Sequence, residues 1–255
     1  MTVELAESSV SEDYNVIEGT DGDDTLVGTD DADEILGYGG DDSLYGEGDD
    51  DLIYGGADDD YIEGNDGADD IYGGSGDDEI NGGDGKDKLF GGSGEDTIYS
   101  GNDSENFLFG GDDNDTLYGG EGSNWLEGDD GDDTIYGGDE QDFIYGDDGI
   151  YGNGDDGNDE IYAGGASDHI YAGGGDDYID AGDGHDLVYA GTGNDTVYGG
   201  IGNDEIYSGD GDNYIEAGDG DDTVYLGDDD NQVYGEDGDD AFYGGDGANQ
   251  VYGGA

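Results

Sequence analysis

A large apolar residue recurs every nine residues along nearly the whole chain, with glycine and polar residues between one recurrence and the next. One extra residue precedes Leu108, and the spacing is irregular at 146–153. One apolar residue between polar or aromatic neighbours is typical of a short strand with a single buried side chain. The apolar positions are Ile17, Leu26, Ile35, Leu44, Ile53, Ile62, Ile71, Ile80, Leu89, Ile98, Leu108, Leu117, Leu126, Ile135, Ile144, Ile161, Ile170, Ile179, Val188, Val197, Ile206, Ile215, Val224, Val233, Phe242 and Val251.

The residues between the apolar positions follow a second pattern. The units 73–81, 82–90 and 91–99 each have the form G-G-x-G-x-D-x-U-x, in which U is the apolar residue. We number these nine positions 1 to 9, so that the acid stands at position 6 and the apolar residue at position 8. The glycine-rich stretch predicts a tight turn, because such turns need backbone angles that a Cβ atom disfavours. Position 6 is Asp in twenty units and Asn in the other six, which are Asn15, Asn106, Asn124, Asn213, Asn231 and Asn249.

Other features repeat at the length of two units. Position 7 carries the aromatic residues Phe107, Trp125 and Phe143 in alternate units, and the units between carry Thr97, Thr116 and Thr134. Residues two units apart are therefore expected to stack as neighbouring strands, about 4.8 Å apart. This predicts an all-β fold, a right-handed parallel β-roll (a β-solenoid) with two nonapeptides per coil and roughly thirteen coils. We expect residues 1–9 to form a short N-terminal lead and residues 10–255 to form the roll, with irregularities near 100–109 and 146–153.

The charge of the chain indicates what the roll must bind. The sequence has 75 acidic residues against two basic ones, and a formal net charge of −73. Such a chain repels itself unless cations neutralise the carboxylates, and carboxylate oxygens suit Ca²⁺. The scarcity of Lys and Arg argues against nucleic acid as a partner. No apolar stretch is long enough to span a membrane, and no disulfide or thiolate is available because Cys is absent.

The tandem nonapeptides resemble the RTX (repeats-in-toxin) family, whose calcium-binding repeat has this form. The resemblance covers residues from about 10 to 255. It implies a calcium-loaded parallel β-roll, secretion without a cleaved N-terminal signal, and folding only in extracellular calcium. It implies many Ca²⁺ ions, on the order of one per nonapeptide. It gives the role of metal ligand to the position-6 acids Asp24, Asp33, Asp42, Asp51, Asp60, Asp69, Asp78, Asp87, Asp96, Asp115, Asp133, Asp142, Asp159, Asp168, Asp177, Asp186, Asp195, Asp204, Asp222 and Asp240.

Two departures from the repeat predict weaker sites. Where Asn replaces Asp at position 6, the site loses a charge and is expected to bind calcium less tightly. Where position 4 is not Gly, the turn is expected to be strained or less fully loaded. These position-4 residues are Asp31, Asp49, Asp58, Ser104, Asp113, Glu140, Ala166 and Asp229.

The sequence predicts an extracellular or cell-surface structural module that calcium folds and stiffens, such as a surface filament, surface-layer or adhesin stalk subunit. We expect no enzyme activity, since no Ser-His-Asp set, phosphate loop or EF-hand loop is present. Head-to-tail self-association through open solenoid ends is expected to be possible, because unpaired edge strands recruit other chains. Two alternatives stay open: a module that binds ice, glycan or mineral, and the secretion or folding region of a larger type I-secreted protein.

Two outer features bear on these alternatives. Tyr fills position 9 of most units. These rings are expected to point outward and stack between coils as a ladder. The alternative is that they form a stripe that binds a sugar or another surface. The aromatic residues at position 7 are the best candidates for an exposed apolar patch.

Overall fold

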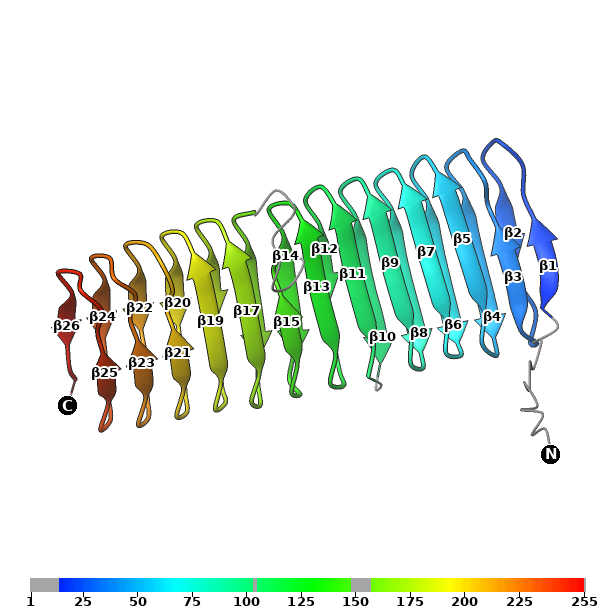
Figure 1. Ribbon diagram of the computed structural model, residues 1–255. Helices are drawn as coiled ribbons and strands as arrows, with labels where there is room; N and C mark the ends of the chain where they lie inside the picture. Colours follow the sequence, from blue (N-terminus) through cyan, green and yellow to red (C-terminus); the bar gives the residue numbers. More distant parts are fainter. Residues whose placement is uncertain (1–13, 103–104, 148–156, 255) are drawn as a thin grey trace, which may run out of the picture.

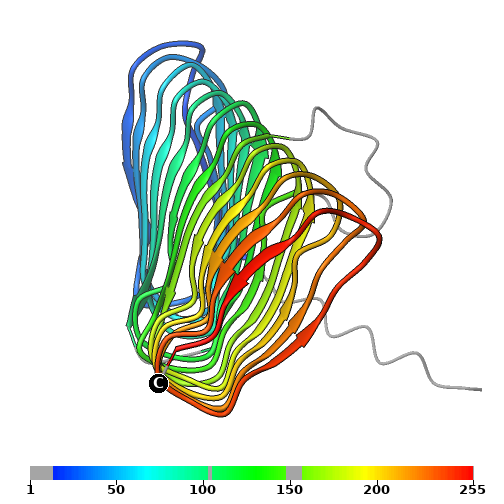
Figure 2. The ribbon, with the colours of Figure 1, turned by 90° about the vertical axis from the view of Figure 1, so that its left-hand side faces the viewer.

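A computed structural model of the chain describes residues 14–102, 105–147 and 157–254. The predicted N-terminal lead, residues 1–9, lies outside the described residues, and so does most of the irregular segment at 146–153. The described residues form a long row of stacked coils, each contributing one strand to each of two sheets (Figure 1). Seen along the row, each coil is a flattened loop that lies over the next one (Figure 2).

The two sheets each contain thirteen parallel strands, and consecutive strands of the chain alternate between them. This confirms the predicted all-β solenoid with two nonapeptides per coil. The first sheet, here called sheet A, contains the odd-numbered strands β1 (Asn15–Glu18), β3 (Asp33–Leu36), β5 (Leu52–Ala57), β7 (Asp70–Ser75), β9 (Lys88–Ser93), β11 (Phe107–Asp112), β13 (Trp125–Asp130), β15 (Phe143–Tyr145), β17 (His169–Gly174), β19 (Leu187–Thr192), β21 (Glu205–Tyr207), β23 (Thr223–Tyr225) and β25 (Ala241–Tyr243). Sheet B contains the even-numbered strands β2 (Thr25–Val27), β4 (Ser43–Gly48), β6 (Tyr61–Asp66), β8 (Glu79–Asp84), β10 (Thr97–Asn102), β12 (Thr116–Tyr118), β14 (Thr134–Gly138), β16 (Glu160–Gly164), β18 (Tyr178–Asp180), β20 (Thr196–Tyr198), β22 (Tyr214–Glu216), β24 (Gln232–Tyr234) and β26 (Gln250–Tyr252).

Strand register follows the repeat. Ile53 pairs with Ile71 eighteen residues later, as the two-unit coil requires. The extra residue before Leu108 lengthens one coil by a residue, since Leu89 pairs with Leu108. The irregular segment lengthens another coil by eight residues, since Ile135 pairs with Ile161. The insertions therefore leave the stacking of the coils intact on both sides.

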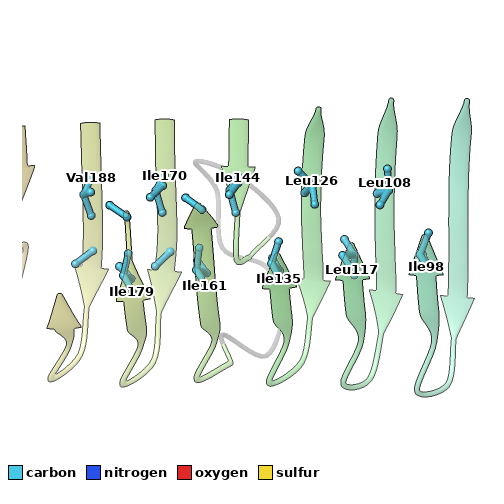
Figure 3. Close-up of a cluster of buried hydrophobic side chains, with 14 of the residues drawn as sticks. Ile98, Leu108, Leu117, Leu126, Ile135, Ile144, Ile161, Ile170, Ile179 and Val188 are labelled. Carbon is cyan, nitrogen blue, oxygen red and sulfur yellow. The ribbon is translucent and has the colours of Figure 1, made fainter. Parts of the chain in front are cut away.

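The core is the narrow space between the two sheets. The position-8 residues from Ile35 to Val233 are all fully buried there, and Figure 3 shows their side chains in the central coils. Toward the ends of the row, Ile17, Leu26 and Phe242 are only partly buried, and Val251 is 44% exposed. Each coil thus gives two apolar side chains to one continuous core, which is why the fold needs many coils to be stable.

Position-9 aromatic rings stack along the outside of both sheets. On sheet A, Tyr171 and Tyr189 stack with ring centroids 4.8 Å apart, and Tyr189 and Tyr207 are 4.6 Å apart. On sheet B, Tyr99 and Tyr118 stack in the same way at 4.8 Å. The predicted outward ladder is therefore present, and its spacing is that of neighbouring strands.

Candidate metal sites in the turns

The turns lie in two files, one along each edge of the flattened coil. We call the file of turns that lead into sheet A the A rim, and the file that leads into sheet B the B rim. Asp51, Asp69 and Asp87 are successive position-6 residues of the A rim, and Asp60 and Asp78 belong to the B rim. Of the twenty predicted ligands, eighteen are buried, whereas Asp24 and Asp240, near the ends of the row, are half-buried. The structure thus brings the predicted residues together as two files.

In every buried acid except Asp33, the backbone of the neighbouring coil holds one carboxylate oxygen. The backbone N–H of Asp51 donates to Oδ1 of Asp69 at 2.8 Å, and the N–H of Asp69 donates to Oδ1 of Asp87 at 2.9 Å. The same bond crosses the long insertion, from Asp133 N–H to Asp159 Oδ1 at 2.9 Å. This ladder fixes each side chain inside its turn and explains why position 6 needs a short side chain with an acceptor oxygen.

The second carboxylate oxygen has no hydrogen-bond partner. In seventeen of the buried acids, Oδ2 is shielded from solvent and unpaired, and in Asp33 the unpaired atom is Oδ1. A buried, unpaired carboxylate oxygen is costly, because burial removes its hydration and nothing replaces it. We call the turns with an unpaired Oδ2 open turns. They belong to Asp42, Asp51, Asp60, Asp69, Asp78, Asp87, Asp96, Asp115, Asp133, Asp142, Asp159, Asp168, Asp177, Asp186, Asp195, Asp204 and Asp222.

Glycine at position 1 keeps space beside the unpaired oxygen. A Cβ atom added to Gly73 would overlap Oδ2 of Asp78 in the same turn and the carbonyl oxygen of Gly91 in the next coil. The same two kinds of oxygen crowd the corresponding point at Gly64. The carboxylate and a backbone carbonyl of the neighbouring coil therefore face one small space, which only a residue without a large side chain leaves open.

Burial makes these carboxyls poor acids when no cation is present. Desolvation raises the pKa of Asp69, Asp78, Asp168 and Asp177 to about 8, and that of Asp115 and Asp159 to about 9. The backbone hydrogen bond lowers the pKa in each case, and the negative charges of neighbouring acids raise it further. A divalent cation beside Oδ2 would reverse both unfavourable effects, because it replaces the lost hydration and neutralises the file.

Side chains alone do not make a metal site here. Within the described residues, no group of three or more His, Asp or Glu side chains is close enough to hold a metal ion. A cation in an open turn would therefore be held by the position-6 carboxylate together with backbone carbonyl oxygens. Such a set of hard oxygen atoms fits Ca²⁺, which commonly takes backbone carbonyls among its ligands.

The Asn turns show which carbonyl oxygens face the same space. Asn124 Oδ1 accepts the N–H of Asn106 at 3.1 Å, as an Asp would in this ladder. Its side-chain amide then donates to the carbonyl oxygens of Gly119 and Gly122, at positions 1 and 4 of the turn, both at 2.9 Å. Asn213 repeats this, with its amide on the carbonyls of Ser208 at 3.1 Å and Gly211 at 3.2 Å. In these turns the NH₂ group of Asn thus stands where an Asp would have Oδ2. It donates to the carbonyl oxygens that a cation beside Oδ2 would contact.

The first two described turns are closed in a different way. Thr replaces Gly at position 2, and the backbone N–H and hydroxyl of Thr20 donate to Oδ2 of Asp24 at 2.7 and 2.8 Å. Thr29 does the same for Oδ2 of Asp33, at 2.6 and 3.0 Å. Sequence reasoning treated Asp24 and Asp33 like the other acids. The Thr at position 2 could have indicated that Oδ2 of these two carboxylates accepts hydrogen bonds from the protein itself.

The predicted strain at position 4 is present in some of the turns. Asp49, Asp58, Asp113 and Ala166 all adopt left-handed backbone angles, with φ between 67° and 80°. Such angles are unfavourable for residues with a Cβ atom. Asp31, Glu140 and Asp229 do not have positive φ, so their turns take another path, and Ser104 lies outside the described residues.

Position 5 forms a second ladder that sequence reasoning missed. The side chain of Asp59 accepts the N–H of Asp77 at 2.9 Å in the next coil, and Asp77 accepts the N–H of Glu95 at 3.0 Å. His185 takes part through Nδ1, which accepts the N–H of Asn203 at 2.7 Å. The signal was the frequency of Asp and Asn at this position. These side chains are exposed and bond the coil that follows, whereas the position-6 acids are buried and bond the coil that precedes.

Comparison with known proteins agrees with this architecture. The RTX calcium-binding nonapeptide repeat matches the chain in ten overlapping windows, which together run from residue 18 to residue 255 with short gaps. The chain therefore belongs to the RTX calcium-binding repeat family, and it is a calcium-binding repeat module built as a β-solenoid. No curated protein sequence matches it. Among the described residues, no helix is long and apolar enough to cross a membrane.

Proposed function

We propose that the chain is a calcium-dependent extracellular structural module, such as a surface filament, surface-layer or adhesin stalk subunit, and that it is not an enzyme. The observation that carries this proposal is the two files of buried, unpaired carboxylate oxygens. At neutral pH a chain that buries so many acids cannot keep this fold without cations, so its stiffness is conditional on their supply.

Each open turn is proposed to take one calcium ion, which is fewer than one per nonapeptide because some turns are closed. The position-6 carboxylate would hold the ion through Oδ2 while Oδ1 stays bonded to the preceding coil. The carbonyl oxygens at positions 1 and 4 would complete the protein's share of the ligands. Bound calcium supplies the positive charge that lets stacked carboxylates lie one coil apart.

The regularity of the coils supports a structural role. The same ladder, core residue and ring stack recur along the described row, so one mechanical unit is repeated rather than varied around a single site. A solenoid of this kind gains length with each coil while contacts stay between neighbours. Function would then follow from length and stiffness.

Secretion is proposed to proceed by a type I-like route without a cleaved signal peptide, as is typical of RTX proteins. Calcium outside cells would then fold the chain.

Self-association through the edge strands is also proposed. In the described structure, β1, β2, β25 and β26 each pair on one side only, and Tyr252 is 50% exposed. Edge strands with free backbone groups are suited to pairing with another copy.

The decisive experiment is a calcium titration from chelator upward, followed by far-UV circular dichroism and by particle size. We expect a cooperative gain of β signal with a decrease in hydrodynamic radius, and no such change with magnesium at equal concentration. Growth into multimers after folding would support the filament form, and a monomeric rod would favour a spacer. A chain that is fully folded in chelator would contradict the calcium dependence.

A surface-binding module is a second candidate because of one observation. Phe107, Trp125 and Phe143 are neighbours at position 7 of sheet A, and Phe143 is 38% exposed. Trp125 and Phe143 lie with ring centroids 6.1 Å apart beside a shallow hollow. Exposed aromatic rings of this kind contact glycans and flat surfaces. Binding of the folded protein to insoluble polysaccharide, lost in the Trp125→Ala variant, would favour this candidate.

A further inference from the structure

The six Asn units differ from the Asp units in more than charge. In every unit with Asp at position 6, position 1 is Gly or Ala, whereas three Asn units carry Val10, Ser208 or Leu226 there. In the Asp units this position borders the unpaired Oδ2. The Asn units thus tolerate a larger side chain beside the space that the Asp units keep free. This sequence difference is independent of the hydrogen bonds that the Asn side chains make.

The Asn side chains donate hydrogen bonds to the backbone carbonyl oxygens that would otherwise bind a cation. Asn124 has its Oδ1 fixed by the N–H of Asn106, so its NH₂ group must face the interior of the turn. There it donates both hydrogens, one to Gly119 and one to Gly122. In Asn231 the amide donates to the carbonyl of Asp229, again at position 4, at 3.1 Å. A donor in this place is incompatible with a cation, because both need the same carbonyl oxygens.

We propose that the Asn turns are built to stay free of calcium, with the Asn amide in place of the ion, so that the calcium array is interrupted at fixed coils. The inference rests on the proposed function and specifies which turns take part in it. Sequence reasoning predicted weaker sites at the Asn units. The hydrogen bonds instead make the turns of Asn124 and Asn213 complete without an ion, and the Asn231 amide serves the position-4 carbonyl in the same way.

The Asn turns are not scattered along the solenoid. Asn106 and Asn124 occupy consecutive coils of the A rim, and Asn213, Asn231 and Asn249 occupy three consecutive coils of the B rim. In each of these coils the opposite rim has an Asp turn, such as that of Asp115 or Asp222. A coil with one Asn turn and one open turn therefore needs one ion, whereas a coil with two open turns needs two. Folding of these stretches should require less calcium than folding of the stretches between.

Bound calcium per chain tests the proposal. The triple Asn→Asp variant, Asn124→Asp/Asn213→Asp/Asn231→Asp, also carries Ser208→Gly and Leu226→Gly so that position 1 is Gly in all three turns. It is compared with the wild type and with a control, Asp142→Asn/Asp195→Asn/Asp204→Asn, at one free calcium concentration. Excess magnesium is present to displace ions held loosely by surface charge. We expect three more ions in the first variant than in the wild type. We expect three fewer in the control, whose new amides would close open turns of the same two rims.

A site-resolved measurement uses the only tryptophan of the chain, which directly follows Asn124. Terbium replaces calcium as the probe, and tryptophan is excited selectively at the red edge of its absorption. The Asn124→Asp variant should give more sensitised terbium emission than the wild type. The matched Asn213→Asp variant, whose turn precedes Tyr214 in a distant coil, should not.

The outcomes separate the two proposals. A wild type that binds no calcium would overturn the proposed function, and this inference with it. A calcium-loaded wild type would leave the proposed function standing. If the triple Asn→Asp variant then gained no ions, or if Asn124→Asp left terbium emission unchanged, this inference alone would be overturned.

Discussion

The backbone N–H of Asp78 donates to Oδ1 of Asp96, one coil further along the B rim, at 2.7 Å. This bond holds the two carboxylates in one file and points the other oxygen of each into a turn where no protein donor meets it. The same contact therefore supports the fold and creates its main electrostatic cost. Any agent that removes the charge from Oδ2, whether a cation or a proton, should relieve that cost.

Protonation should partly replace calcium at low pH. Burial raises the pKa of Asp78 to about 8 and that of Asp96 to about 7, both far above the value of about 3.9 in an unfolded chain. The folded state then binds more protons than the unfolded state, so this contribution to stability is complete below about pH 4 and is lost as pH rises toward about 8. We expect calcium-stripped protein to show β signal by circular dichroism near pH 4 and to lose it by pH 9.

The control for this experiment is the calcium-loaded protein, whose folding should change little between pH 7 and pH 9. Particle size must be followed at each pH, because the isoelectric point of the sequence is about 4.1 and a neutral chain associates readily. A stripped chain that stays unfolded and monomeric at pH 4 would show that relief of charge alone does not permit the fold.

Position 4 of the turn offers a matched pair of substitutions. Ala166 is left-handed with φ of 69°, so Ala166→Gly should stabilise the protein by about 1 kcal/mol, because Gly adopts such angles without the penalty of a Cβ atom. Gly94 has φ of 120° and lies against the carbonyl of Gly76, with no room for a Cβ atom. Gly94→Ala should therefore destabilise by more than that. Denaturant unfolding at saturating calcium measures the change in the free energy of unfolding for both variants. Equal changes in the two variants would contradict this account.

The repeat allowed most of the fold to be predicted, and the reason is physical. One apolar residue every nine, with sub-patterns at eighteen, permits only a coil of two units, and the pairing of Ile53 with Ile71 follows directly. Two properties of the site could not be obtained this way. The Asn124 amide contacts carbonyls at positions 1 and 4 because of turn geometry that a repeat pattern does not encode. The contact of Thr29 with Asp33 Oδ2 comes from a departure from the repeat at position 2. The role of the position-6 acids as ligands stays a prediction.

Loss of a core side chain should act locally along the solenoid. Ile135 is fully buried and pairs with Leu117 and Ile161 on either side. Ile135→Ala should cost about 2–5 kcal/mol, because it leaves a cavity between two sheets that cannot close on it. Val251, which is 44% exposed, is the control, and Val251→Ala should cost much less.

Hydrogen exchange in saturating calcium is the suitable measurement for this pair, since a solenoid need not unfold in one step. Amides of the coils next to Ile135 should lose protection, and those of the coils near Ile53 should keep it. A uniform loss along the whole chain would indicate that the solenoid unfolds as one cooperative unit.

The ring stack on sheet A should contribute to stability through its faces and not through its hydroxyl groups. Tyr189 stacks on Tyr171 and on Tyr207 with interplanar angles of 5° and 9°, so its removal breaks two contacts at once. At about 0.5–1.5 kcal/mol for each aromatic pair, Tyr189→Ala should destabilise the calcium-loaded protein by about 1–3 kcal/mol beyond the loss of buried area. Tyr189→Phe keeps the ring and should be nearly neutral in denaturant unfolding. If the Phe variant were as unstable as the Ala variant, the hydroxyl would be the stabilising group, and the ladder would owe its regularity to hydrogen bonding instead of stacking.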